Sequence, residues 1–116
     1  MNIEEIREYC ISLKGVTEGF PFDETTLVFK VMNKMFCLLG LDDFRVSLKN
    51  DAEKNIELRA HFPAIIAGYR LNKQHWNTIL LNGTVPPELL IEMVDKSYQL
   101  IVESLPKKKQ IELKNL

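Results

Sequence analysis

Two cysteines and two histidines are the residues of this chain best suited to nucleophilic or metal chemistry. Cys10 and Cys37 are the only thiols, and His61 and His75 are the only imidazoles. Their spacing is not that of a zinc site, so we expect no metal and no cofactor. A Cys37–His75 nucleophile pair stays open, although Cys37 falls in an apolar strand pattern where a thiol is inert. We expect both cysteines to lie in the core.

The neighbouring carboxylates of Asp42 and Asp43 are a second possible site. Two such carboxylates could bind a divalent cation. Asp is also frequent in turns, because its side chain accepts hydrogen bonds from nearby backbone N–H groups. Gly40 precedes the pair and a strand pattern follows it, so we expect a turn. The chain also lacks the common phosphate-binding, serine-hydrolase and zinc-protease motifs, and we expect no enzyme.

An alternating segment predicts a strand with one polar face. Residues 44–49 alternate between apolar and polar side chains, as in a half-buried strand. Its apolar face should consist of Phe44, Val46 and Leu48. Its polar face should display Arg45, Ser47 and Lys49.

A predicted hairpin before this strand adds two cations. Residues 26–32 and 35–39 have strand patterns, and Asn33-Lys34 joins them at the length of a two-residue hairpin. Lys30 lies opposite the apolar face of the first of these strands, which consists of Leu27, Phe29 and Val31. Lys34 would lie at the hairpin tip, where it could act as a wing that enters a DNA groove. One open face of the sheet could then display the side chains of Lys30, Arg45, Ser47 and Lys49 together.

The segment 64–75 fits neither strand nor helix spacing, and it carries Arg70, Lys73 and His75 before Trp76. An exposed Trp76 could stack on a nucleobase or on a partner. The alternative is a core tryptophan that packs against the sheet beneath the helices. Likewise, lysines and arginines on a solvated sheet face need no ligand to explain them.

Two capping boxes mark helix starts. Asn2 with Glu5 predicts a helix over residues 3–13, where apolar residues recur every three or four positions. Asn50 with Glu53 predicts a second helix in the same way. The apolar stripe of this second helix should consist of Ala52, Ile56 and Ala60.

A third helix should begin at Pro86-Pro87, because proline suits the first turn of a helix. Its apolar residues continue at helical spacing to Pro106, and we expect the basic segment 106–116 to be frayed. A strand over residues 76–81 completes the order helix, three strands, helix, strand, helix. This order predicts an α+β fold, a small two-layer sandwich whose antiparallel sheet packs against helices.

Composition and charge limit the classes of function. The 116 residues fit a single domain, 1–116, and the net charge is only −1. The stretch from residue 58 to 87 contains three bases and no acid, so it could form a basic surface that meets phosphate. No apolar run is long enough for a membrane span, and two thiols do not form a disulfide framework. We expect a cytoplasmic monomer that does not enter membranes.

Five short stretches together resemble the MmcQ/YjbR family of small bacterial proteins. They occur in the family's order and cover nearly the whole chain: Glu18–Phe22, Val28–Phe36, Val46–Lys49, Asn72–Thr78 and Ser97-Tyr98. The resemblance implies an α+β fold similar to the CyaY-like group. It also implies a DNA-binding role with a double-wing arrangement. The residues that match family positions and could form a shared site are Lys30, Lys34, Lys49, Lys73, His75 and Trp76.

The sequence leads us to expect a non-catalytic protein that binds DNA weakly through a basic sheet face and a hairpin wing. The expected phosphate contacts are Lys30, Lys34, Arg45, Lys49, Arg70 and Lys73, with His75 or Trp76 stacking or hydrogen bonding. Such binding should depend steeply on salt and little on DNA sequence. The alternative is an interaction or regulatory module whose cationic face meets an acidic protein, with Phe20, Phe22 or Tyr69 as apolar anchors. A protein that binds a small molecule or anion is a third alternative.

Overall fold

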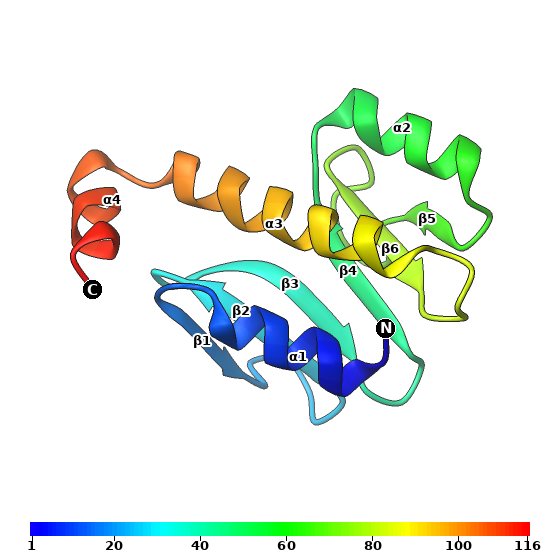
Figure 1. Cartoon of the computed structure of the whole chain (residues 1–116), viewed down its shortest axis with the longest axis horizontal. Helices are drawn as coiled ribbons and strands as arrows, with labels where there is room; N and C mark the ends of the chain where they lie inside the picture. Colours follow the sequence, from blue (N-terminus) through cyan, green and yellow to red (C-terminus); the bar gives the residue numbers. More distant parts are fainter.

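The computed structural model describes residues 1–116 and has two layers (Figure 1). Its strands are β1 (Val16–Gly19), β2 (Thr26–Val31), β3 (Lys34–Gly40), β4 (Arg45–Lys49), β5 (Ile65–Ala67) and β6 (Trp76–Leu80). Its helices are α1 (Ile3–Ser12), α2 (Ala52–His61), α3 (Pro87–Ser104) and α4 (Lys107–Lys114). The strands form one antiparallel sheet in the order β1-β2-β3-β4-β6-β5. The predicted α+β sandwich is confirmed.

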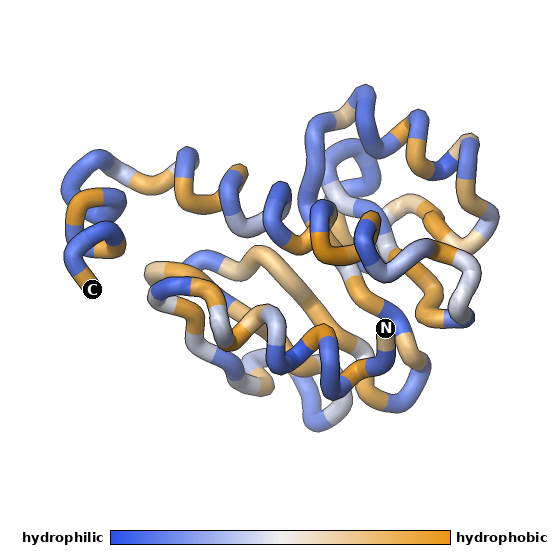
Figure 2. Tube along the Cα trace, viewed as in Figure 1, coloured by the Kyte–Doolittle hydropathy of each residue, from blue (hydrophilic) through white to orange (hydrophobic).

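Helices α1, α2 and α3 cover the same face of the sheet. Helix α3 packs across β2, β3 and β4, while α1 packs on β1 and α2 on β5 and β6. Along α1 and α3, hydrophobic and hydrophilic residues alternate with the period of an amphipathic helix (Figure 2). The buried side chains of both layers join in one core, which leaves the other sheet face without a helix.

The predicted side-chain alternation of β2 and β4 is confirmed. In β4, Val46 and Leu48 are in the core, while Arg45, Ser47 and Lys49 lie on the face away from the helices. Phe44 is an exception, because it belongs to the preceding turn with a positive φ of 53° and is 57% exposed. The strand therefore begins one residue later than its apolar pattern indicated.

The hairpin between β2 and β3 turns one residue earlier than predicted. Val31 pairs with Lys34, so the two turn residues are Met32 and Asn33 rather than Asn33 and Lys34. Both have positive φ, 48° and 69°, as a two-residue hairpin with the twist of the strands requires. The strand register therefore places Met32 in a left-handed conformation that methionine seldom adopts.

A β-bulge near the hairpin changes which residues of β3 face the core. The register between β2 and β3 shifts at Phe29/Lys30, so that Phe29 pairs with Cys37 and Lys30 with Met35. Phe36 and Cys37 are consecutive, yet both belong to the core, because the bulge interrupts the alternation of side chains. The prediction that β3 is interior is confirmed.

The first predicted capping box is confirmed and the second is wrong. The Asn2 side chain accepts from the Glu5 backbone N–H, and the Glu5 carboxylate accepts from the Asn2 backbone N–H. At α2 the N-cap is Asp51, which makes no side-chain cap hydrogen bond. The side chain of Asn50 instead accepts from the backbone N–H of Asp51.

The apolar stripe predicted for α2 is also wrong. Ile56 is 63% exposed, and the residues that α2 buries are Asn55 and Leu58. The Asn55 amide donates to the backbone carbonyls of Asn50 and Gln74. These hydrogen bonds connect α2 to the segment before β6. They therefore turn the Asn55 side of the helix toward the sheet, rather than the side that carries Ala52, Ile56 and Ala60.

Two strands and one helix were not predicted. Strands β1 and β5 have only four and three residues and lie at the two edges of the sheet. The tail 106–116, expected to fray, forms α4 instead. Its Leu113 is buried next to Gly15, and Lys14 donates from Nζ to the backbone carbonyl of Lys114. These contacts are long-range, so the local sequence gave no sign of them.

The predicted third helix is confirmed as α3, which begins with Pro87 at its first turn and ends at Ser104. Its buried residues follow the predicted helical spacing and include Leu90, Val94, Ser97 and Ile101. None of the helices has the length and apolar character to cross a membrane.

Candidate nucleic-acid interface

The sheet face opposite the helices carries three of the predicted cations. Arg45 and Lys49 lie on it in β4, and Lys30 lies on it in β2, where its neighbours Phe29 and Val31 face the core. All three side chains are partly exposed. The prediction that Lys30, Arg45, Ser47 and Lys49 share one face therefore agrees with the strand registers.

The segment 68–75 folds over part of this face. The backbone N–H of Tyr69 donates to Thr78 Oγ1 at 3.0 Å, and Thr78 Oγ1 lies 2.7 Å from Ser47 Oγ. The backbone N–H of Gly68 donates to the Trp76 carbonyl at 2.9 Å. A Cβ atom on Gly68 would lie 2.8 Å from Trp76 Cβ, so glycine is needed for this close approach.

Trp76 is therefore not an exposed stacking residue. Its side chain lies on the same face as Lys49, its partner in the β4–β6 register, and it is only 8% exposed. The alternative of a buried tryptophan is correct, but Trp76 lies on the face away from the helices rather than beneath them and does not belong to the main core. The segment 68–75 helps to cover it. The exposed aromatic residues near this face are Tyr69, at 53%, and Phe22, at 64%.

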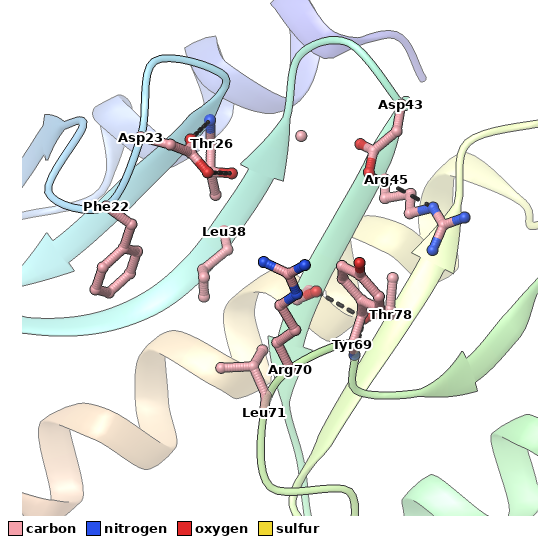
Figure 3. A pocket seen from close by; sticks show the side chains of 12 residues that line it. Phe22, Asp23, Thr26, Leu38, Asp43, Arg45, Tyr69, Arg70, Leu71 and Thr78 are labelled. Carbon is pink, nitrogen blue, oxygen red and sulfur yellow. Dashed lines mark hydrogen bonds and ion pairs between the residues drawn. The ribbon is translucent and has the colours of Figure 1, made fainter.

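A pocket of about 290 Å³ lies between the turn that contains Phe22 and the segment that contains Tyr69. Figure 3 shows Leu38 between Phe22 and Arg70. Beyond them, the Tyr69 ring lies between two guanidinium groups, with its centroid 5.6 Å from Arg45 Cζ and 5.2 Å from Arg70 Cζ. These are cation–π distances. The stack holds Arg70 at the edge of the pocket.

Arg70 has a positive φ of 58°. This left-handed conformation costs a non-glycine residue free energy and persists only where surrounding contacts hold it. Here the contacts are the Tyr69 ring and the hydrogen bond between Tyr69 and Thr78. Such strain is concentrated at functional sites, and Arg70 lines this pocket.

Two carboxylates also line the pocket, and both have local partners. Backbone N–H groups of Thr25 and Thr26 donate to Asp23 and hold the pKa of its carboxyl below the usual value. Asp43 lies in the turn before β4, as predicted, and its Oδ2 is 3.7 Å from Arg45 Nε. These acids close one end of the pocket (Figure 3). The sequence placed Asp23 in a turn with Phe20 and Phe22, as expected of an Asp that accepts from the backbone two residues on, but it did not indicate that Asp23 lines a pocket.

Most of the predicted cations have no acidic partner. Arg45 pairs with Asp43, but no ion pair involves Lys30, Lys49, Arg70 or Lys73. Lys73 donates from Nζ to the Gly68 carbonyl, a hydrogen bond within the segment 68–75 that covers Trp76. Four cations on or beside the open face thus remain available to an anion.

Lys34 and His75 do not join this group. Lys34 is directly opposite Val31, a core residue, and residues opposite each other in a strand pair point to the same face. Lys34 is thus exposed on the helix side of the hairpin. His75 is exposed too, and its backbone bonds to Asn50 and to the Asn72 side chain.

The cysteines do not form a catalytic or metal site. Cys10 and Cys37 are free and fully buried, and burial raises the pKa of the Cys37 thiol. Since His75 is exposed, a Cys37–His75 pair is excluded. No group of three His, Cys, Asp or Glu side chains is placed to hold a metal ion.

Comparison with known proteins identifies the family. The family model described as YjbR matches residues 11–100, which include every candidate site residue. The chain is 32% identical to the uncharacterized protein YjbR of Escherichia coli K12 over 112 residues, 95% of each chain. The chain belongs to the YjbR family. A second YjbR-family relative, the uncharacterized protein YbdF of Escherichia coli O157:H7, is 29% identical over 92% of this chain and 89% of its own.

Solved structures similar to this YjbR-family chain support the same fold. The Deinococcus radiodurans protein DR2400, with a DUF419 domain, superposes with a TM-score of 0.90 and 43% identity over 97% of this chain and 87% of its own. A Pseudomonas syringae protein superposes with a TM-score of 0.74 at 24% identity, over 86% of this chain and 98% of its own. The second match supports the fold alone.

Proposed function

We propose that this YjbR-family protein is a non-catalytic DNA-binding protein that uses its open sheet face. The observation that carries the proposal is the set of cations without acidic partners on and beside that face, Lys30, Lys49, Arg70 and Lys73. Cations that neutralise phosphates release condensed counterions, and this term supplies most of the affinity in non-specific binding.

The distribution of acids supports the same face. Although Asp23 and Asp43 line the pocket on the open face, the acidic residues of α1 and α3 lie on the opposite side of the sheet. DNA on the open face would therefore be separated from them by the sheet and the core. This separation explains how a protein with a net charge of only −1 can present a surface that attracts phosphate.

Binding of this kind carries little sequence preference. Lysine is a point charge on a flexible stem, and contacts to phosphate fix position without reading bases. The helix that would enter a DNA groove in common DNA-binding motifs has no counterpart on this face, because all the helices that contact the sheet cover its other side.

Charge reversal tests the proposed face. The variant Lys30→Glu/Lys49→Glu should bind labelled mixed-sequence DNA at least about tenfold more weakly, because two phosphate contacts become repulsive. The matched control is Lys107→Glu/Lys108→Glu, which makes the same charge change at exposed positions of α4. Both are measured by fluorescence anisotropy at low salt. If both variants lose the same affinity, the loss reflects the change in net charge alone. That result would contradict the proposal that DNA binds the open sheet face.

A second candidate function is an interaction module for an acidic protein. The observation in its favour is the exposure of Phe20, Phe22 and Tyr69, which could anchor a partner beside the cations. This candidate requires that a partner co-purify in stoichiometric amount after nuclease treatment and be lost in Phe22→Ala. The absence of DNA binding together with such a partner would replace the first proposal with the second.

A further inference from the structure

The pocket beside Tyr69 differs in character from the cationic surface around it. Its floor includes the partly exposed Leu38, and its two sides carry the Phe22 ring and the Arg70 guanidinium (Figure 3). The planar Phe22 ring and the planar Arg70 guanidinium, with apolar Leu38 between them, would fit a planar and partly apolar ligand. Nucleobases stack on aromatic rings and on guanidinium planes in this way.

The charges inside the pocket disfavour phosphate there. Asp23 and Asp43 both line it, and Arg45 is already paired with Asp43. A phosphate in the pocket would meet two carboxylates. The amino groups of a base would instead find acceptors in those carboxylates. Of the cations without acidic partners, Arg70 lines the pocket, whereas Lys30, Lys49 and Lys73 do not. The sugar-phosphate backbone of the same strand would run along these three lysines.

From this arrangement we propose that the pocket binds an unpaired nucleobase, so that the open face prefers single-stranded nucleic acid over duplex. This inference rests on the proposed function and specifies its substrate. A pocket of about 290 Å³ is at the small end of ligand sites and accommodates one base, not a base pair. In a duplex the bases are paired and stacked, so no base could enter the pocket.

The contacts assign separate roles to the residues around the pocket. Phe22 and Arg70 stack on the base from opposite sides. Tyr69 lies behind Arg70 and, with Arg45 on its other side, holds the guanidinium in place. Tyr69 is therefore a positioning residue. Phe22 contacts the base directly, so its loss should lower the affinity for single-stranded nucleic acid the most. Phe20 lies in the same turn and is 50% exposed, but it does not line the pocket.

The test compares a labelled 20-nucleotide single strand with its duplex, in anisotropy titrations with the intact protein at low salt. The single strand should bind at least about fivefold more tightly, the value of one stacked base. Phe22→Ala should remove this preference and leave duplex affinity unchanged. Phe20→Ala, the matched control, should change neither affinity. Both phenylalanines are exposed, so neither variant should disturb the fold.

The outcomes separate this inference from the proposed function. Equal binding of both forms, unaffected by Phe22→Ala, would overturn the base pocket while the phosphate-binding face would stand. Tighter binding of the duplex would overturn it as well. Failure to bind either form at low salt would overturn the proposed function itself. A strand of abasic sugar-phosphate gives a further check, because it should bind no better than duplex if the base is what the pocket recognises.

Discussion

At the scale of single residues, Tyr9 connects the first helix to the third. Its hydroxyl donates a hydrogen bond to the carboxylate of Asp95, which raises the pKa of Tyr9 to about 12. The ordinary value for tyrosine is about 10. Because the folded-state pKa is the higher one, the hydrogen bond contributes its full stability below pH 10. That contribution is lost as the pH rises from 10 toward 12.

Tyr9→Phe should therefore change how stability depends on pH. The free energy of unfolding of the wild type should fall above pH 10 more steeply than that of the variant, since the variant has no Tyr9 proton to lose in the unfolded chain. Urea unfolding between pH 7 and 11, followed by circular dichroism, measures both slopes. Identical slopes would show that the Tyr9–Asp95 hydrogen bond does not contribute to stability.

The sequence predicted some residues of the candidate site and not others. Alternation along a strand placed Lys30, Arg45 and Lys49 on one face, since this pattern is local. The exposure of aromatic residues is not local. Trp76 is buried because the segment after Gly68 folds back over it, and the same fold exposes Tyr69. Nothing in the spacing of residues 64–75 could show this.

At the scale of elements, Ser97 joins α3 to two strands. Its hydroxyl donates to the Phe36 carbonyl of β3 and accepts from the Lys49 backbone N–H of β4, at the strand that carries two of the site's cations. The side chain is fully buried. Ser97 is a polar residue at the centre of the apolar stripe of α3. It is accommodated there because its hydroxyl bonds backbone groups that have no strand partner where the pairing of β3 is irregular.

Ser97→Ala should cost about 2 kcal/mol of unfolding free energy, because buried polar groups lose a partner. Ser104→Ala is the control, since the Ser104 hydroxyl bonds only to the Ile101 carbonyl of its own helix. It should change stability by less than about 0.5 kcal/mol. Chemical denaturation at neutral pH gives both values. A loss as small as that of the control would mean that the Ser97 bridge is not a support of the sheet.

The sequence predicts helices and strands whose apolar residues recur with a clear period. It does not predict short elements, or elements that form only because of contacts with distant parts of the chain. The amphipathic pattern of α3 and the alternation of β4 specify these elements locally. Strands β1 and β5 are too short to show a period, and they exist because longer neighbours β2 and β6 pair with them. Helix α4 has little amphipathic character and depends on Leu113 packing beside Gly15.

At the scale of the whole molecule, the sheet separates two regions of different charge. The helix layer carries the acidic residues of α1 and α3. The open face carries cations without acidic partners, beside the Asp23 and Asp43 carboxylates of the pocket. The net charge of −1 conceals this polarity. The sequence could show that acids are missing from residues 58–87, but only the fold places Lys30 and Lys49 with the cations of that segment.

The salt dependence of binding to a labelled single strand tests the central claim most directly. If the cations of the open face neutralise about three or four phosphates, the logarithm of the association constant should fall linearly with the logarithm of salt concentration. The expected slope is about −2 to −3. The same titration with Lys30→Glu/Lys49→Glu should give a clearly shallower slope. Binding that is absent at low salt, or that does not change with salt, would contradict the account.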